Sequence, residues 1–327
     1  MKVNSAASWL ALFCLLVPSG VAPVRAAIFR ENFDRPPLEN GWHVFGAASL
    51  FHWDEAARQM EVTWDSGRSN SFFHRPLGTV LTREDDFSLA FDLRLEEVRI
   101  GVDPNKPYTF ELAVGFLHLA SATRPGFVRG KRAGTRNIVE FDYFPDFETF
   151  GATVALTVVS SNSLFRYSHN FPMDLPPGDL FRIALQYRAL SQVLSTTITR
   201  NGDPFQAIED LALDPAFSDF RVDTVSISNY SDALADGSLL AHGTIDGIVL
   251  EVPDPPVTAL AARFVGQRWQ VSFDARARWT YALERTRDWR RWQEVTRTVP
   301  EEDARLVMED PEPVTGASFY RVRAERP

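Results

Sequence analysis

The sequence predicts an all-β protein in which an antiparallel β-sandwich or jelly roll is followed by a second, smaller β-sandwich. Apolar and polar residues alternate with a period of two over many short segments, and turn-forming residues separate these segments. Helical periodicity is nearly absent, and its longest trace, Ile208 to Leu213, is too short to matter. Many antiparallel strands in a chain of 327 residues require two packed sheets.

The first 26 residues have the features of a secretory signal peptide. Met1-Lys2 forms a short, positively charged N-terminal region, and Trp9 to Val17 is apolar. Small residues flank a predicted cleavage site before Ala27. The apolar stretch is too short and wrongly flanked for a membrane span. We therefore expect residues 1–26 to be removed and the mature protein to be secreted, whether it is periplasmic, extracellular or on the cell surface.

Charge and cysteine content exclude several classes of protein. The full chain has a net charge of −9, and loss of Lys2 and Arg25 with the signal peptide would make it −11. An acidic surface argues against nucleic acid and anionic membranes as partners. The single cysteine, Cys14, leaves with the signal peptide, so disulfides and thiol catalysis are excluded in the mature chain. No later stretch is long and apolar enough for membrane insertion.

The strands and domains follow from the alternation and the turns between them. The clearest strands are Phe87 to Leu95, Phe110 to Phe116, Val139 to Tyr143, Val154 to Val158 and Phe181 to Tyr187. Prolines at 253, 255 and 256 cannot join a sheet ladder, so 253–256 is predicted to be a linker. We expect the large domain over 27–252 and a small β-sandwich module over 257–327, near the size limit for an independent core.

The segment from Ile138 to Asp146 carries the clearest candidate site. Its apolar residues alternate toward the core, so Glu140 and Asp142 share the opposite face, about 6.6 Å apart at Cα. Pro145 ends the ladder, and Asp146 can curl back toward the pair. Three oxygen ligands from one strand and its exit loop suit calcium or manganese. The alternative is a solvated strand face with two ordinary acids.

Val139-Glu140-Phe141-Asp142, followed by Phe144 and Asp146, resembles the metal-binding strand of legume-type lectins, which have a concanavalin A-like jelly roll. The resemblance spans most of residues 28–252. It implies that Glu140 and Asp142 bind a transition metal, that Asp142 bridges to calcium, and that the Phe144 carbonyl and Asp146 complete part of the calcium site. The lectins' metal-binding histidine has no counterpart at 152–154, and their sugar-binding Ala-Asp-Gly is missing from 108–114.

The same strand is also similar to that of the laminarinase-type glucanases, which share the fold. That resemblance implies Glu140 as nucleophile and Asp142 as its helper. The acid/base would be a Glu at position 144 or 145, where Phe144 and Pro145 stand. Asp146 is roughly 20 Å from Glu140 along an extended strand, whereas retaining hydrolysis needs carboxyl groups about 5–5.5 Å apart. We therefore predict no catalytic residue and keep a divergent glycoside hydrolase as an alternative.

The two ends of the large domain, Phe29 to Asp34 and His242 to Leu250, resemble the first and last strands of secreted bacterial laminin-G-like or concanavalin A-like domains. In such jelly rolls these strands often lie side by side, and a structural calcium can sit between them. The resemblance implies a second cation site formed by Glu31 or Asp34 with Asp246. The alternative is ordinary polarity at a strand end.

These observations predict a general class of function but not a particular ligand. The C-terminal module resembles small, fibronectin-like β-sandwich modules of secreted bacterial proteins. The six histidines show no metal-ligand spacing, and no nucleophile elbow, phosphate loop or dinucleotide fingerprint occurs. We predict a secreted, non-catalytic protein that binds an extracellular glycan or another cell-surface component, with calcium as its candidate cofactor. A purely structural surface component is the third alternative.

Overall fold

The structure is a computed structural model that describes residues 26–129, 135–146, 151–314 and 317–326. The predicted signal peptide lies outside these residues except for Ala26. Strands make up nearly all of the regular structure, and the named strands pair in antiparallel fashion. The predicted all-β, antiparallel fold class is therefore confirmed.

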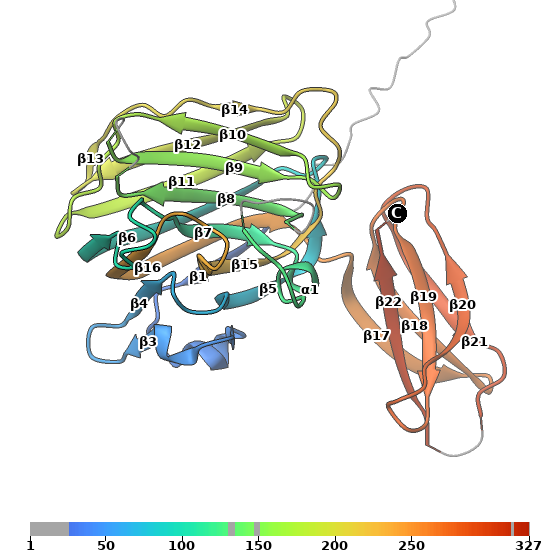
Figure 1. Ribbon diagram of the computed structural model, residues 1–327. Helices are drawn as coiled ribbons and strands as arrows, with labels where there is room; N and C mark the ends of the chain where they lie inside the picture. The colour runs from blue at the N-terminus through green and yellow to red at the C-terminus, as the bar shows by residue number, and fades with distance from the viewer. Residues whose placement is uncertain (1–25, 130–134, 147–150, 315–316, 327) are drawn as a thin grey trace, which may run out of the picture.

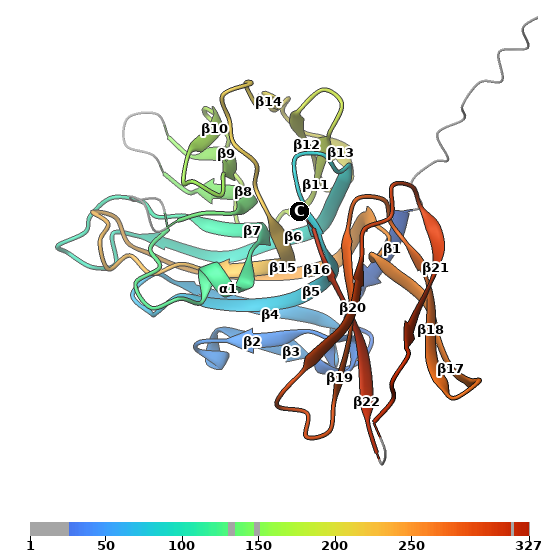
Figure 2. The ribbon, with the colours of Figure 1, turned by 90° about the vertical axis from the view of Figure 1, so that its right-hand side faces the viewer.

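Two large sheets stack to form the jelly roll (Figures 1 and 2). The nine strands of the first sheet are β1 (Ala26–Glu31), β3 (Phe51–Asp54), β4 (Gln59–Asp65), β6 (Phe87–Ile100), β11 (Leu180–Arg188), β12 (Val193–Arg200), β13 (Asp203–Pro204), β14 (Leu211–Ala212) and β16 (Leu239–Pro253). Their order is β13-β12-β11-β6-β16-β4-β3, with β1 beside β16 and β14 beside β12.

The second sheet carries the candidate site. Its seven strands are β2 (His43–Phe45), β5 (Ser71–Leu81), β7 (Leu112–Leu117), β8 (Ile138–Phe144), β9 (Thr153–Val159), β10 (Phe165–Asn170) and β15 (Val222–Asn229). Their order is β10-β9-β8-β7-β15-β5-β2, so β10 and β2 form the two edges.

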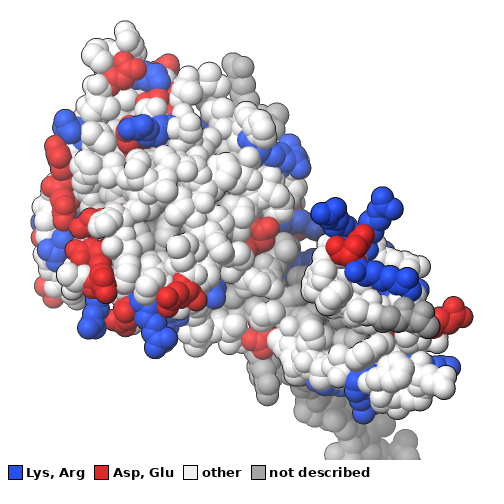
Figure 3. All heavy atoms as spheres, turned by 90° about the horizontal axis from the view of Figure 1, so that it is seen from below, with Lys and Arg blue, Asp and Glu red and all other residues white. Residues whose placement is uncertain are grey.

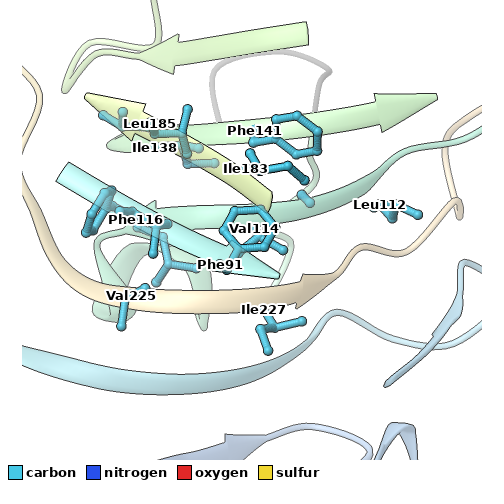
Figure 4. Close-up of a cluster of buried hydrophobic side chains, with 14 of the residues drawn as sticks. Phe91, Leu112, Val114, Phe116, Ile138, Phe141, Ile183, Leu185, Val225 and Ile227 are labelled. Carbon is cyan, nitrogen blue, oxygen red and sulfur yellow. The ribbon is translucent and has the colours of Figure 1, made fainter. Parts of the chain in front are cut away.

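Apolar side chains from both sheets meet in one core (Figure 4). In β6, buried residues alternate with more exposed ones from Phe87 to Leu95, as the sequence predicts. Phe91 of β6 packs edge-on against Phe141 of β8, with ring centroids 6.0 Å apart. In contrast, Ile138 to Tyr143 of β8 are buried on both faces. The outer face of the seven-stranded sheet must therefore be covered there by another part of the chain.

The first and last strands of the jelly roll lie side by side, which confirms that expectation. β1 pairs with β16, and Ala27 lies opposite Val252 while Glu31 lies opposite Ile248. Pro253, which was predicted to begin the linker, is instead the last residue of β16 and lies opposite Ala26, so the prediction was wrong at this residue. The chain continues to the next strand through residues 254–256.

The C-terminal module consists of two small sheets (Figure 1). One has the order β17-β18-β21 and the other β20-β19-β22. Their strands are β17 (Val257–Val265), β18 (Arg268–Ala275), β19 (Thr280–Thr286), β20 (Gln293–Thr298), β21 (Ala304–Asp310) and β22 (Phe319–Glu325). Phe273, Tyr281 and Leu283 are fully buried at the centre of a core separate from that of the jelly roll.

A buried aspartate joins the module to the jelly roll. Asp85 follows β5, is 5% exposed, and accepts hydrogen bonds from the backbone N–H of Thr82 and the guanidinium of Arg326. Arg276 of the module lies 3.6 Å from its other oxygen. Val80 of β5 packs against the core of the module. The two parts therefore share an ion-paired interface.

Short helices occur only as connections among the described residues. They are two 3₁₀ turns, Pro37–Asn40 and Ala48–Leu50, and one α-helical turn, α1, Leu119–Ala122. Residues 208–213, the longest helix-like trace of the sequence, contain the short strand β14 instead. No helix in the described ranges has the length and apolar character needed to cross a bilayer.

Candidate functional site

Side chains of seven neighbouring strands line up on the outer face of the seven-stranded sheet. One row runs from edge to edge through Tyr167, Thr157, Glu140, Gly115, Ser226, His74 and His43. The next row consists of His169, Ala155, Asp142, Ala113, Ser228, Phe72 and Phe45. Glu140 and Asp142 thus share one face near the centre of the sheet, as the alternation predicts.

The two acids are buried beneath an arginine. Glu140 is 2% exposed and Asp142 0% exposed. Arg129, in the connection between β7 and β8, donates from Nε to Glu140 Oε1 at 2.5 Å and from Nη2 to Asp142 Oδ2 at 2.7 Å. The guanidinium is itself buried. The pair is therefore not the solvated acidic face that was the alternative; it is one half of a buried ion-paired cluster.

Two hydroxyl groups complete the bonding of the acids. Tyr230 donates to Glu140 Oε2 at 2.8 Å, and Thr157 donates to Asp142 Oδ2 at 2.5 Å. The ring of Tyr230 also lies 5.6 Å from the guanidinium carbon of Arg129. Of the four carboxylate oxygens, only Asp142 Oδ1 has no hydrogen-bond partner within the described structure. Such bonding compensates much of the desolvation of these charges.

A glycine makes room for this cluster. Gly115 on β7 lies directly opposite Glu140 on β8. A Cβ atom at position 115 would lie 2.4 Å from the carbonyl oxygen of Val139 and 2.5 Å from the Cβ of Glu140. Because neither neighbour is the end of a flexible side chain, a larger residue at 115 would force the strands apart.

The cluster contains more acids than bases, and this controls its protonation. Burial raises the pKa of Glu140 to about 8 although Arg129 acts in the opposite direction. Burial also raises the pKa of the neighbouring Glu111 to about 7. Burial acts to lower the pKa of Arg129, but Glu140, Asp142 and Glu111 together hold it well above its usual value. One guanidinium therefore lies near three carboxyl groups, and Glu140 and Glu111 retain protons near neutral pH.

These directions predict that the jelly roll loses stability as the pH rises. The pKa values of Glu111 and Glu140 are higher in the folded state than their ordinary value of 4.5, so the folded state binds more protons. Their stabilising contribution is complete below about pH 4.5 and is lost between there and about pH 8. Urea unfolding at pH 5.5 and 8.5 should differ by at least about 1 kcal/mol.

The matched control for this pH effect is the double variant Glu111→Gln, Glu140→Gln. It keeps the shape of both side chains but cannot titrate at either position. Its free energy of unfolding should depend less on pH than that of the unmodified protein. Equal slopes for the two proteins would show that other groups cause the pH dependence.

The residues predicted for the first cation site do not fit a calcium ion. Arg129 lies between the two carboxylates, where a bound cation would have to be. Asp146 is exposed and lines a hollow beside Tyr143 and Asp174, on the core-facing side of β8, instead of turning back to Asp142. Phe144 ends β8 with its ring 6.4 Å from that of His169. Within the described ranges, no three acidic, histidine or cysteine side chains are arranged to hold a metal ion.

At the second predicted cation site, the predicted acids lie near one another, but Glu31 and Asp34 already bind other groups of the protein. Burial raises the pKa of Asp246, and the nearby Asp92, Asp34 and Glu31 raise it further. Glu31, however, accepts hydrogen bonds from the backbone N–H of Phe33, the amide of Asn40 and the indole of Trp42. Asp34 lies 3.2 Å from the exposed Arg58. The acids are near one another, yet Glu31 anchors the N-terminal turn and the group does not fit a calcium ion as placed.

Beyond the buried cluster, the same face of the sheet ends in a row of aromatic rings, which we call the β10 aromatic row: Phe165, Tyr167, His169 and Phe171. The ring of His169 lies 4.8 Å from that of Tyr167 and 5.3 Å from that of Phe171. Tyr167 is 59% exposed and Phe171 39% exposed. Burial lowers the pKa of His169 although Asp142 opposes this, so its ring is neutral at neutral pH.

The edge beside the β10 aromatic row is closed by residues 209–214. Ser168 donates to the carbonyl of Glu209, and Asn170 accepts from the N–H of the same residue. Arg166 pairs with Asp214. These bonds cover part of the edge of β10, so the rings project from a supported strand.

A second concave surface lies between the jelly roll and the module. This cleft of about 590 Å³ is lined by residues of both parts, including Ser88, Gln186, Glu251, Arg276 and Arg326. Two of its charged groups, Arg276 and Arg326, are engaged with Asp85 across the interface. These ion pairs join the two parts beside the cleft.

The sequence did not reveal the residues that cover the acids. Arg129, Tyr230 and Thr157 come from three different elements, and only the fold brings them to Glu140 and Asp142. One signal was present: residues 124–136 carry five basic side chains in a chain of net charge −9, directly before the acidic strand. His74 is buried in β5, and its ring lies 5.8 Å from that of His43.

Comparison with known proteins gives a likeness of fold. No protein-family model matches the chain, and no curated protein matches it. Legume lectins are among the solved structures to which the chain is similar. For peanut lectin the identity is 13%, the TM-score 0.45, and the match covers 68% of this chain and 98% of the lectin.

Two further lectins give similar values. The seed lectin of Lotus tetragonolobus has 11% identity and a TM-score of 0.47, over 70% of this chain and 100% of the lectin. Lectin I of Ulex europaeus, in complex with the methyl glycoside of α-L-fucose, has 10% identity and a TM-score of 0.43, over 68% of this chain and 98% of the lectin. These proteins belong to the group that the sequence resembles. At such identity the likeness concerns the fold alone, so function must be argued from this chain's own side chains.

Proposed function

We propose that the protein is a secreted, non-catalytic glycan-binding protein whose jelly roll binds sugar at the β10 aromatic row. The observation that carries this proposal is the row itself: the exposed or half-buried rings of Tyr167, His169 and Phe171 contact one another at the β10 edge, beside polar side chains. Aromatic faces pack against the apolar faces of sugar rings, and the Tyr167 hydroxyl offers a hydrogen bond at the edge of the row. Secretion is part of the proposal and rests on residues 1–26.

The buried acids support binding without cleavage. A nucleophile must reach the substrate, but Glu140 lies beneath Arg129 and is bonded to Tyr230. A buried carboxyl group with a raised pKa can belong to an active site or to a structural network of ion pairs. The contacts of Glu140 with Arg129 and Tyr230 are those of a structural network. The glucanase alternative lacks an accessible carboxyl pair at the predicted position, so the geometry favours binding over hydrolysis.

A glycan array probed with the mature chain tests the proposal. We expect binding to at least one class of glycan, and no release of reducing ends from that glycan or from β-glucans. An array without any binding would remove the glycan function and leave a structural surface component. Release of reducing ends that disappears in Glu140→Gln would establish the hydrolase alternative.

A further inference from the structure

The loop between β19 and β20 of the C-terminal module is built around one carboxylate. Asp288 Oδ1 accepts hydrogen bonds from the backbone N–H groups of Arg290 and Arg291, both at 2.9 Å. Thr286 Oγ1 donates to the same oxygen at 3.0 Å. Backbone donation from Arg291 and Arg290 lowers the pKa of Asp288. The loop, residues 287–292, therefore has a defined shape held by an ionised side chain.

This shape displays a tryptophan. Trp289 has φ 58°, in the left-handed region that non-glycine residues rarely occupy, and it is 63% exposed. Its ring lies 4.2 Å from that of Phe319 and 5.9 Å from that of Trp292. The guanidinium of Arg321 lies 4.0 Å from the centroid of Trp292. The turn therefore leaves a large aromatic ring at the surface, in contact with a second ring.

Positive charge surrounds these rings. The loop contains Arg287, Arg290 and Arg291, and no acidic side chain of the described residues lies within ion-pair distance of Arg290 or Arg291. A hollow of about 450 Å³ beside the loop has Arg285 and Arg291 among its lining residues. Figure 3 shows basic side chains gathered on the C-terminal module. On a chain of net charge −9, this concentration of arginine favours an anionic partner.

The loop lies at the end of the module that points away from the jelly roll. Thr286 pairs with Phe319 at this end of β19, whereas Thr280 pairs with Glu325 at the other end, next to Arg326 and its contact with Asp85. The two ends of β19 are six residue steps apart, roughly 20 Å along the strand. Large ligands can therefore reach the loop without meeting the jelly roll.

We propose that this loop is a second binding site, for an acidic polysaccharide whose sugar rings carry carboxylates. Trp289 and Phe319 supply faces for the apolar sides of the rings, and Arg290 and Arg291 supply guanidinium groups for the carboxylates. An anionic membrane would also attract the arginines. However, Arg321 covers the face of Trp292 and Asp288 lies within the loop, so the surface fits a hydrated polymer better than the apolar interior of a bilayer. The site is separate from the β10 aromatic row.

The test measures binding of the mature chain to polygalacturonate at low salt, with dextran as the neutral polymer and vesicles containing phosphatidylglycerol as the membrane. We expect binding to polygalacturonate that weakens with added salt, and none to dextran at this site. The variant Arg290→Ala, Arg291→Ala should bind at least tenfold more weakly. The control variant Arg268→Ala, Arg305→Ala changes two arginines of β18 and β21 and should stay within twofold of the unmodified protein.

Three results would overturn the inference: no binding to polygalacturonate, equal weakening by the control variant, or binding to vesicles alone. Trp289→Ala gives a second readout, because it leaves the charge unchanged and should still weaken binding. Tyr167→Ala in the β10 aromatic row should leave polygalacturonate binding unchanged. A failure of the jelly-roll glycan site and a failure of this second site can therefore be distinguished.

Discussion

Replacing Arg129 by methionine is expected to destabilise the jelly roll by about 3–5 kcal/mol at neutral pH, because the change leaves the buried Asp142 carboxylate without its cation and Glu140 without a hydrogen-bond donor. For a domain of this size, the melting temperature should fall by roughly 6–20 °C. Thermal unfolding followed by circular dichroism measures the change. The effect is large because Glu140, Asp142 and Arg129 are all nearly excluded from solvent.

Two controls separate the charge from the loss of packing. Arg124→Met alters an exposed arginine in the same connection and should shift the melting temperature by little. Adding Glu140→Gln and Asp142→Asn to Arg129→Met removes the acidic groups left without their cation and should restore part of the lost stability. If the triple variant were no more stable than Arg129→Met, the charge balance would not be the reason for the effect.

Replacing Tyr167 by alanine is expected to weaken glycan binding at the jelly roll by about 30-fold, since a central aromatic contact contributes at least about 2 kcal/mol. Tyr167 is the most exposed aromatic ring of the β10 aromatic row, so its removal should cost little stability. Isothermal titration with the best ligand from the array measures the affinity.

The matched control for Tyr167 lies at the opposite edge of the same sheet. Phe45 of β2 is 37% exposed on the same outer face, and Phe45→Ala should leave the affinity unchanged. Equal losses for the two variants would mean that a general disturbance of the sheet, and not the row of rings, weakens binding.

The strands could be predicted because alternation depends on local sequence. Phe87 to Leu95 and Val139 to Tyr143 both have period two, and each forms a strand with those residues facing the core. The shared face of Glu140 and Asp142 follows from the same period. The pairing of β1 with β16 could be expected only from the resemblance of the two ends to known domains.

The environment of the acids could not be predicted because it depends on contacts between distant residues. Tyr230 lies 90 residues from Glu140 in sequence, and Arg129 reaches Asp142 from the connection between β7 and β8. The alternation of apolar and polar residues predicts which face of the sheet a side chain lies on. It does not predict which other residues pack over that side chain. For this reason an exposed or metal-bound pair was expected where the structure has a buried pair bonded to arginine.

The central claim is that the outer face of the seven-stranded sheet binds glycan at its β10 edge and does not cleave it. A crystal structure of the mature chain, soaked with the tightest-binding oligosaccharide of the array, tests this claim most directly. We expect an intact oligosaccharide packed on Tyr167 and Phe171, with Arg129 still bonded to Glu140 and Asp142. A cleaved sugar, or a sugar in contact with an uncovered Glu140, would contradict the account.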